Sequence, residues 1–212
     1  MSQYWLEWLT LVSVFGVAVM APGPDFVMAV RNALTYGRAA GVWTALGFGC
    51  GVCVHVAYTL LGIAVLVSQS ILLFSVLKYA GAAYLVYIGF KALKSKGMAR
   101  DETGTNVQAA KPLPAWKAFR SGFVTNLLNP KATLFFLALF TQIARPETPM
   151  AVQILFGLTC VVMVVLWFTA VAFFLTTPRV RAGFLKISAW IDRTCGALFI
   201  ALGCKLALSR AP

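Results

Sequence analysis

Two residues of opposite charge, Asp25 and Lys131, each follow a proline inside a long apolar stretch of the chain. Ionisable side chains are expensive to bury in such surroundings and usually serve a function there. The Asp25 carboxylate could bind a substrate ammonium group or carry a proton, and Lys131 could bind a substrate carboxylate. A cleft with Asp25 on one wall and Lys131 on the other would suit a zwitterion. The structural alternatives are that Asp25 only caps a helix and that Lys131 reaches out to lipid headgroups.

The residues before Asp25 predict a helix break. Pro22 and Pro24 flank Gly23, and two prolines lack the N–H donors that a continuous helix needs. Carbonyl groups that lose their partners cannot be satisfied by lipid. We therefore expect residues 21–26 to face protein, water or substrate.

A second break is predicted before Lys131. Asn126 and Asn129 precede Pro130, and an asparagine at the cap followed by proline is typical of a helix start. Lys131 would then lie at the positive end of a half-helix, where a cation needs a compensating partner. The candidate partners are Asp25, a substrate carboxylate and carbonyl groups freed by the break.

Weaker signals come from residues in other apolar runs. His55, the only histidine, could relay protons, or it could simply bond a backbone carbonyl. Cys50 and Cys53 form a C-x-x-C motif, but no further soft metal ligand follows at a suitable spacing, so we interpret them as structural. Asp192 beside Arg193 is interpreted as a local surface ion pair.

The composition is that of a polytopic membrane protein. Of 212 residues, 60% are apolar and 11% are charged, which is less than half the charged share of a typical soluble domain. Residues 42–67 contain no Lys, Arg, Asp or Glu, and roughly 18 such residues can cross a bilayer as a helix. We therefore expect an all-α fold with six transmembrane helices, the first and fourth broken by proline: residues 5–30, 42–67, 71–93, 119–143, 150–177 and 189–208.

Basic residues predict the orientation of these helices. They gather in the connections between the first and second, third and fourth, and fifth and sixth spans, a side that is normally cytoplasmic. Both termini are then expected outside. The net charge of +12 is accordingly a signal of topology and of contact with anionic lipids, not with nucleic acid.

The two halves of the chain resemble each other weakly. Pro22 aligns with Pro130, Gly89 with Gly203, and Ala82 with Gly196. This predicts two three-helix repeats, residues 1–93 and 118–212, joined by a polar cytoplasmic connector at residues 94–117. Because three helices are an odd number, the second repeat must be inverted, an arrangement found in many secondary transporters.

Several motifs together resemble the LysE/RhtB family of bacterial amino-acid exporters over essentially the whole chain. They are residues 21–26 (Ala-Pro-Gly-Pro-Asp-Phe), 76–85 (Val-Leu-Lys-Tyr-Ala-Gly-Ala-Ala-Tyr-Leu), 123–131 (Phe-Val-Thr-Asn-Leu-Leu-Asn-Pro-Lys), 190–192 (Trp-Ile-Asp) and 196–199 (Gly-Ala-Leu-Phe). The last two look most like the homoserine/threonine branch.

The resemblance implies an inner-membrane exporter of small amino acids driven by the proton gradient. It assigns the site to Pro22, Gly23, Pro24, Asn126, Asn129, Pro130 and Lys131, whereas Asp25 and His55 match only part of the family. No cofactor is implied, and homodimerisation is left open. The chain has no nucleophile paired with a base and no phosphate-binding loop, so we do not expect an enzyme. The alternative is a membrane carrier of thiols or electrons, which would need paired cysteines at the helix breaks.

Overall fold

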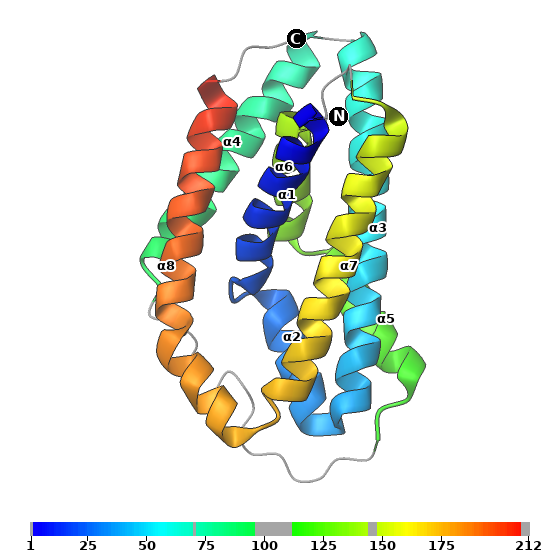
Figure 1. The fold of residues 1–212 in the computed structure, drawn as a ribbon, viewed down its shortest axis with the longest axis vertical. Coiled ribbons are helices and arrows are strands. Elements are labelled where there is room, and N and C mark those ends of the chain that lie inside the picture. The colour runs from blue at the N-terminus through cyan, green and yellow to red at the C-terminus, as the bar shows by residue number, and fades with distance from the viewer. Residues whose placement is uncertain (1, 70, 96–111, 144–147, 209–212) are drawn as a thin grey trace.

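The computed structural model describes residues 2–69, 71–95, 112–143 and 148–208, and these residues form eight α-helices. In chain order the helices are α1 (Ser2–Met20), α2 (Pro24–Tyr36), α3 (Arg38–Gln69), α4 (Ile71–Leu93), α5 (Ala115–Leu127), α6 (Pro130–Ile143), α7 (Met150–Phe174) and α8 (Pro178–Leu208). They run along one elongated bundle, with the start of α1 and the end of α8 at the same end (Figure 1). The predicted all-α class is confirmed. Most of the predicted connector, residues 94–117, lies outside the described residues.

Two helices of the described part are long and apolar enough to cross a membrane. They are Arg38–Leu61 within α3 and the whole of α7, and a third span results if α1 and α2 are taken as one span bent by 59°. The prediction of six spans in two inverted repeats therefore remains a prediction.

The helices α2, α3 and α8 extend beyond the limits expected from the sequence. A single residue, Gly37, separates α2 from α3, and its φ is +90°. Residues that carry a side chain rarely adopt this backbone angle. One glycine therefore reverses the chain where a loop of about ten residues was expected. Helix α8 begins at Pro178 rather than at residue 189, because its charged first turns are helical as well.

Glycines bring the helix pairs α3–α5 and α4–α8 into close contact. A Cβ on Gly122 of α5 would collide with the carbonyl of Thr44 in α3. In the other pair, a Cβ on Gly89 would lie 2.7 Å from the carbonyl oxygen of Gly196, and one on Gly203 would lie 2.8 Å from that of Ala82. Only glycine permits this approach, which is typical of packed membrane helices.

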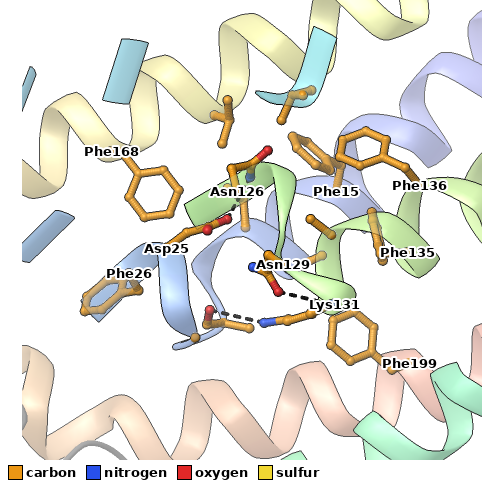
Figure 2. A pocket seen from close by; sticks show the side chains of 17 residues that line it. Phe15, Asp25, Phe26, Asn126, Asn129, Lys131, Phe135, Phe136, Phe168 and Phe199 are labelled. Carbon is orange, nitrogen blue, oxygen red and sulfur yellow. Dashed lines mark hydrogen bonds between the residues drawn. The ribbon is translucent and has the colours of Figure 1, made fainter. Parts of the chain in front are cut away.

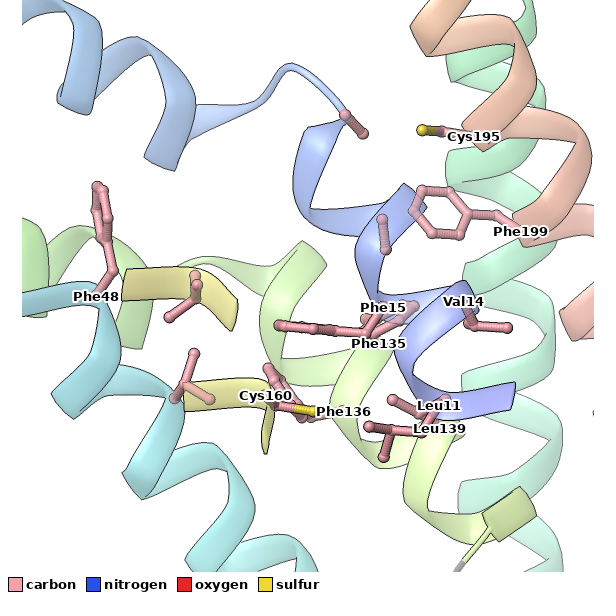
Figure 3. Close-up of a cluster of buried hydrophobic side chains, with 14 of the residues drawn as sticks. Leu11, Val14, Phe15, Phe48, Phe135, Phe136, Leu139, Cys160, Cys195 and Phe199 are labelled. Atoms are coloured by element: carbon pink, nitrogen blue, oxygen red, sulfur yellow. The ribbon is translucent and has the colours of Figure 1, made fainter. Parts of the chain in front are cut away.

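Aromatic rings fill the interior between the two broken helices. Phe15 of α1 lies 5.5 Å from Phe136 of α6, and Phe135 lies 5.9 Å from Phe199 of α8, measured between ring centroids (Figure 3). Nearby, the buried side-chain amide of Asn32 on α2 donates to Thr44 of α3 and Ser121 of α5, each at 2.9 Å. These contacts hold both breaks in the centre of the bundle.

Candidate functional site

The first break separates α1 from α2 at residues 21–23, as predicted. The N–H of Ala21 donates to the carbonyl of Ala18 at 3.3 Å instead of continuing the helix. Gly23 is extended and precedes Pro24, the first residue of α2. Asp25 follows in the first turn, where the helix dipole favours a carboxylate. The break therefore places the Asp25 carboxylate close to backbone carbonyl groups at the end of α1.

The second break separates α5 from α6 at Leu128 and Asn129, also as predicted. The side-chain oxygen of Asn129 accepts the N–H of Lys131 at 3.0 Å, which is the capping contact expected of an asparagine before proline. The carbonyl oxygen of Asn129 accepts the N–H of Thr133 at 3.1 Å, so the new helix is regular from its first turn. Lys131 consequently projects from a fixed helix start.

The two breaks meet through a hydrogen bond. The Nδ2 of Asn126, at the end of α5, donates to Oδ2 of Asp25 at 2.8 Å, and the Asn129 side chain also interacts with this carboxylate. Asp25 Oδ1 is buried without a hydrogen-bond partner. Among the described pocket-lining residues, Asn126 Oδ1 is likewise buried without a hydrogen-bond partner, and it lies against Gly51 of α3, where any Cβ would collide with it. Since buried acceptors are nearly always satisfied, Asp25 Oδ1 awaits a donor.

Lys131 faces Asp25 across the same space without forming an ion pair in the described part of the chain. Its Nζ donates to the carbonyl oxygen of Ala21 at 3.3 Å and lies 5.6 Å from the ring centroid of Phe199 (Figure 2). A Cβ on Gly23 would lie 3.6 Å from this nitrogen, so the ammonium group packs against the backbone of the first break. An ammonium group has three donors, and the described part of the chain accepts from one of them.

A pocket lies between these groups. It is lined by four polar side chains within an otherwise apolar wall: Asp25, Asn126, Asn129 and Lys131, with Phe15, Ala18, Val19, Ala21, Gly23, Phe26, Val52, Ala132, Phe135, Phe136, Val164, Phe168 and Phe199. Such a mixture of apolar walls and few polar groups is typical of small-molecule sites.

Five of the nine predicted site residues line the pocket: Gly23, Asp25, Asn126, Asn129 and Lys131. Pro22 and Pro24 belong to the first break and are not among the described lining residues, and Pro130 begins α6 after the second break.

His55 lies behind the pocket rather than in it. Its Nε2 is 3.1 Å from the carbonyl oxygen of Asn126, which also accepts the N–H of Asn129 at 3.0 Å because Pro130 offers it no N–H. Its Nδ1 is 2.9 Å from the hydroxyl of Tyr58, and its ring stacks on Phe136. These contacts agree with the structural interpretation of His55, in which its ring bonds a backbone carbonyl.

We expect His55→Leu to destabilise the protein, because the carbonyl of Asn126 would lose its contact with His55 and keep only the hydrogen bond from the N–H of Asn129. The net loss of one hydrogen bond costs about 0.5–1.5 kcal/mol. Unfolding of the detergent-solubilised protein measures the change, with Cys53→Ser, an exposed site on the same helix, as the control. An unchanged stability of His55→Leu would show that this contact does not support the break.

The surface interpretation of Asp192 is wrong. Its side chain is 7% exposed and accepts a hydrogen bond from the hydroxyl of Ser95, whereas Arg193 is exposed. Asp192 also interacts electrostatically with Lys131. Cys195, one turn along α8, donates from Sγ to the carbonyl of Val17 at 3.1 Å and so satisfies a carbonyl near the first break.

No cysteine is among the described residues that line the pocket, and the five cysteines are free. Nor do the described residues contain a group of three or more His, Cys, Asp or Glu suited to a metal ion. The pocket thus carries charge and hydrogen-bonding groups, without a thiol pair.

Two helix breaks that present opposite charges to one pocket are typical of membrane transport proteins with broken helices. Sequence comparison then gives its family: residues 16–210 match the LysE type translocator, and the chain belongs to this family.

Three relatives illustrate what the chain is similar to. It is 32% identical to the threonine efflux protein of Escherichia coli (strain K12) over 206 residues, which covers 95% of this chain and 98% of the relative. It is 27% identical to the homoserine/homoserine lactone efflux protein of Salmonella typhimurium over 218 residues, with 98% of both chains covered. It is 28% identical to the uncharacterized membrane protein YrhP of Bacillus subtilis over 206 residues, covering 95% and 98%. The efflux relatives are transporters and not enzymes. No solved structure matches the chain.

Proposed function

We propose that this chain is a secondary exporter that binds a small amino acid as a zwitterion between its two helix breaks and carries it out of the cell in exchange for protons. The observation that supports the proposal is that one pocket has a hydrogen-bond acceptor, Asp25 Oδ1, on one side and a hydrogen-bond donor, Lys131 Nζ, on the other. Among the residues that the structure describes, Asp25 Oδ1 has no donor, and Lys131 Nζ has one acceptor.

Each end of an α-amino acid then has a partner. The substrate ammonium donates to Asp25 Oδ1, and the substrate carboxylate accepts from Lys131 Nζ. Charge-assisted hydrogen bonds of this kind are about twice as strong as neutral ones. Both partners sit on helix starts fixed by proline, so their positions are set before the substrate arrives.

Proton exchange follows from the same carboxylate. An unpaired charge in an apolar pocket is costly, so Asp25 takes up a proton when the substrate ammonium leaves. Substrate and proton therefore compete for one group, which is the minimal requirement for antiport. Entry of protons down their gradient would drive the empty site back toward the cytoplasm.

Alternating access would come from rocking of the two inverted three-helix repeats, residues 1–93 and 118–212, around the site. The α4–α8 contact supports this arrangement. The sequence alignment places Gly89 on Gly203 and Ala82 on Gly196, so exchanging the repeats maps the Gly89–Gly196 contact onto the Gly203–Ala82 contact. An inner-membrane location with both termini outside completes the proposal.

Efflux from intact cells tests the proposal. Cells expressing the chain are loaded by feeding dipeptides that contain threonine, homoserine, leucine or lysine, and the amino acid released is measured against cells with an empty vector. Faster release of at least one amino acid, abolished when the proton gradient is collapsed, is the expected result. Equal release from both cultures despite verified insertion would contradict the proposal.

The thiol-carrier alternative makes the opposite prediction for the cysteines. Because none of them lines the pocket in the described structure, replacing all five with alanine is expected to leave efflux per inserted protein intact, while replacement of the buried Cys160 and Cys195 would cost some stability. The assay is the one above, with membrane content checked by immunoblotting. Loss of efflux from an inserted cysteine-free protein would instead favour thiol chemistry.

A further inference from the structure

The α-ammonium and α-carboxylate groups of a bound amino acid would pair with both charged side chains of the pocket. Of the described residues that line it, only Asp25 and Lys131 are charged. If these two bind the ammonium and carboxylate groups, as proposed above, a charged substrate side chain would have no counter-ion. An unpaired charge in such a pocket is strongly disfavoured, which excludes lysine, arginine, aspartate and glutamate.

The remaining polar side chains of the pocket are Asn126 and Asn129, and each already makes one hydrogen bond at a helix break. Asn126 donates to Asp25 through Nδ2, and its Oδ1 lies against Gly51. Asn129 accepts the N–H of Lys131 through Oδ1. Among the described lining residues there is no serine, threonine, tyrosine or glutamine. Apart from these two amides, the hydroxyl of a threonine or homoserine substrate would meet no uncharged side-chain partner among the described lining residues.

Aromatic rings make up the rest of the wall. They come from α1, α2, α6, α7 and α8: Phe15, Phe26, Phe135, Phe136, Phe168 and Phe199. Figure 2 shows that they surround the polar groups, with Phe168 beside Asp25 and Phe199 beside Lys131. Contact with such rings is favourable for an apolar side chain and leaves a hydroxyl unsatisfied.

We infer that the preferred substrates of this chain are neutral amino acids with apolar side chains, such as leucine and phenylalanine, rather than hydroxylated or charged ones. The inference rests on the proposed function. The expected substrates differ from the threonine and homoserine named for the relatives only in the side chain. An unsatisfied hydroxyl corresponds to a loss of about 10- to 100-fold.

Reconstitution of the purified full chain into liposomes tests this directly. The liposomes are loaded with equal concentrations of radiolabelled leucine, phenylalanine, threonine, homoserine or lysine, and efflux is followed with an inwardly directed proton gradient. Leucine or phenylalanine is expected to leave at least about tenfold faster than threonine. Threonine, homoserine or lysine leaving as fast as leucine would overturn the inference while the exporter function stands. Efflux of none of the five would overturn both.

A gain of hydroxyl in the wall gives a second test. Phe135 lies four residues after Lys131 on α6, so the two side chains share a face. Phe135→Tyr should raise the threonine-to-leucine efflux ratio severalfold, and Phe168→Tyr on α7 serves if the first variant is not inserted. Phe90→Tyr, an exposed site on α4, should leave the ratio unchanged. An unchanged ratio in inserted variants of both pocket phenylalanines would contradict the inference.

Discussion

Lys131→Ala is expected to abolish amino-acid efflux while the protein remains inserted. The ammonium group is the one cation among the described residues of the pocket, and a hydrogen bond to a charged partner is worth about 1.5–3 kcal/mol. Its loss also leaves Asp25 without a positive neighbour. We expect a fall in efflux rate of at least about 100-fold, measured in proteoliposomes at equal protein content.

Two further lysine variants make this result interpretable. Lys205→Ala removes an exposed cation from α8, and its efflux should match the wild type. Lys131→Arg keeps the charge on a larger group, so partial efflux is expected. If Lys131→Ala exported as fast as Lys205→Ala, substrate carboxylates would not bind at this position.

Asp25→Asn is expected to have a similarly large effect for a different reason. The substituted side chain can still accept the 2.8 Å hydrogen bond from Asn126, so the break should persist. It cannot neutralise an ammonium group or exchange a proton, and we expect efflux to fall by at least about 100-fold because a buried charge loses its counter-ion, at about 3–5 kcal/mol.

The proton dependence of the remaining transport separates these two roles. Residual efflux through Asp25→Asn should no longer respond to an imposed pH gradient, whereas residual efflux through Lys131→Ala should still respond. Glu7→Gln, which alters a carboxylate of α1 outside the pocket lining, is the matched control and should behave as the wild type. A normal response of Asp25→Asn to the gradient would place the exchanged proton elsewhere.

The helix breaks were predictable from sequence because their causes are local. Pro22 and Pro24 remove donors from their own turn, and Asn129 with Pro130 forms a helix start within a few residues. Asp25 and Lys131 are charged residues within apolar stretches, so the sequence also predicts that each needs a partner. These features depend on neighbours in the chain and not on how the helices are arranged.

The walls of the pocket could not be predicted in the same way. Phe168 and Phe199 reach it from α7 and α8, and their direction depends on the rotation of each helix, which the sequence does not specify. Asp192 was misread for a related reason, since its neighbour Arg193 lies on another face of α8. A charged pair adjacent in sequence is separated by about 100° on a helix.

The limits of the helices were also misjudged where charge was read as a loop signal. Residues 31–41 were expected to be a connection, but only Gly37 interrupts the two helices there. Helices rich in apolar residues can continue past the membrane surface and expose charged turns. Composition therefore locates the apolar core of such a helix better than its ends.

The most direct test of zwitterion recognition is competition binding to the detergent-purified protein. The radiolabelled amino acid that the chain exports fastest is bound first, and is then challenged with its carboxamide, which lacks the carboxylate, and with its deaminated acid, which lacks the ammonium group. The account predicts that the parent amino acid displaces the label, while neither analogue does so at a roughly 100-fold higher concentration, about 2.7 kcal/mol. Displacement by either analogue as effective as that by the amino acid would contradict the pairing of Asp25 and Lys131 with the two ends of the substrate.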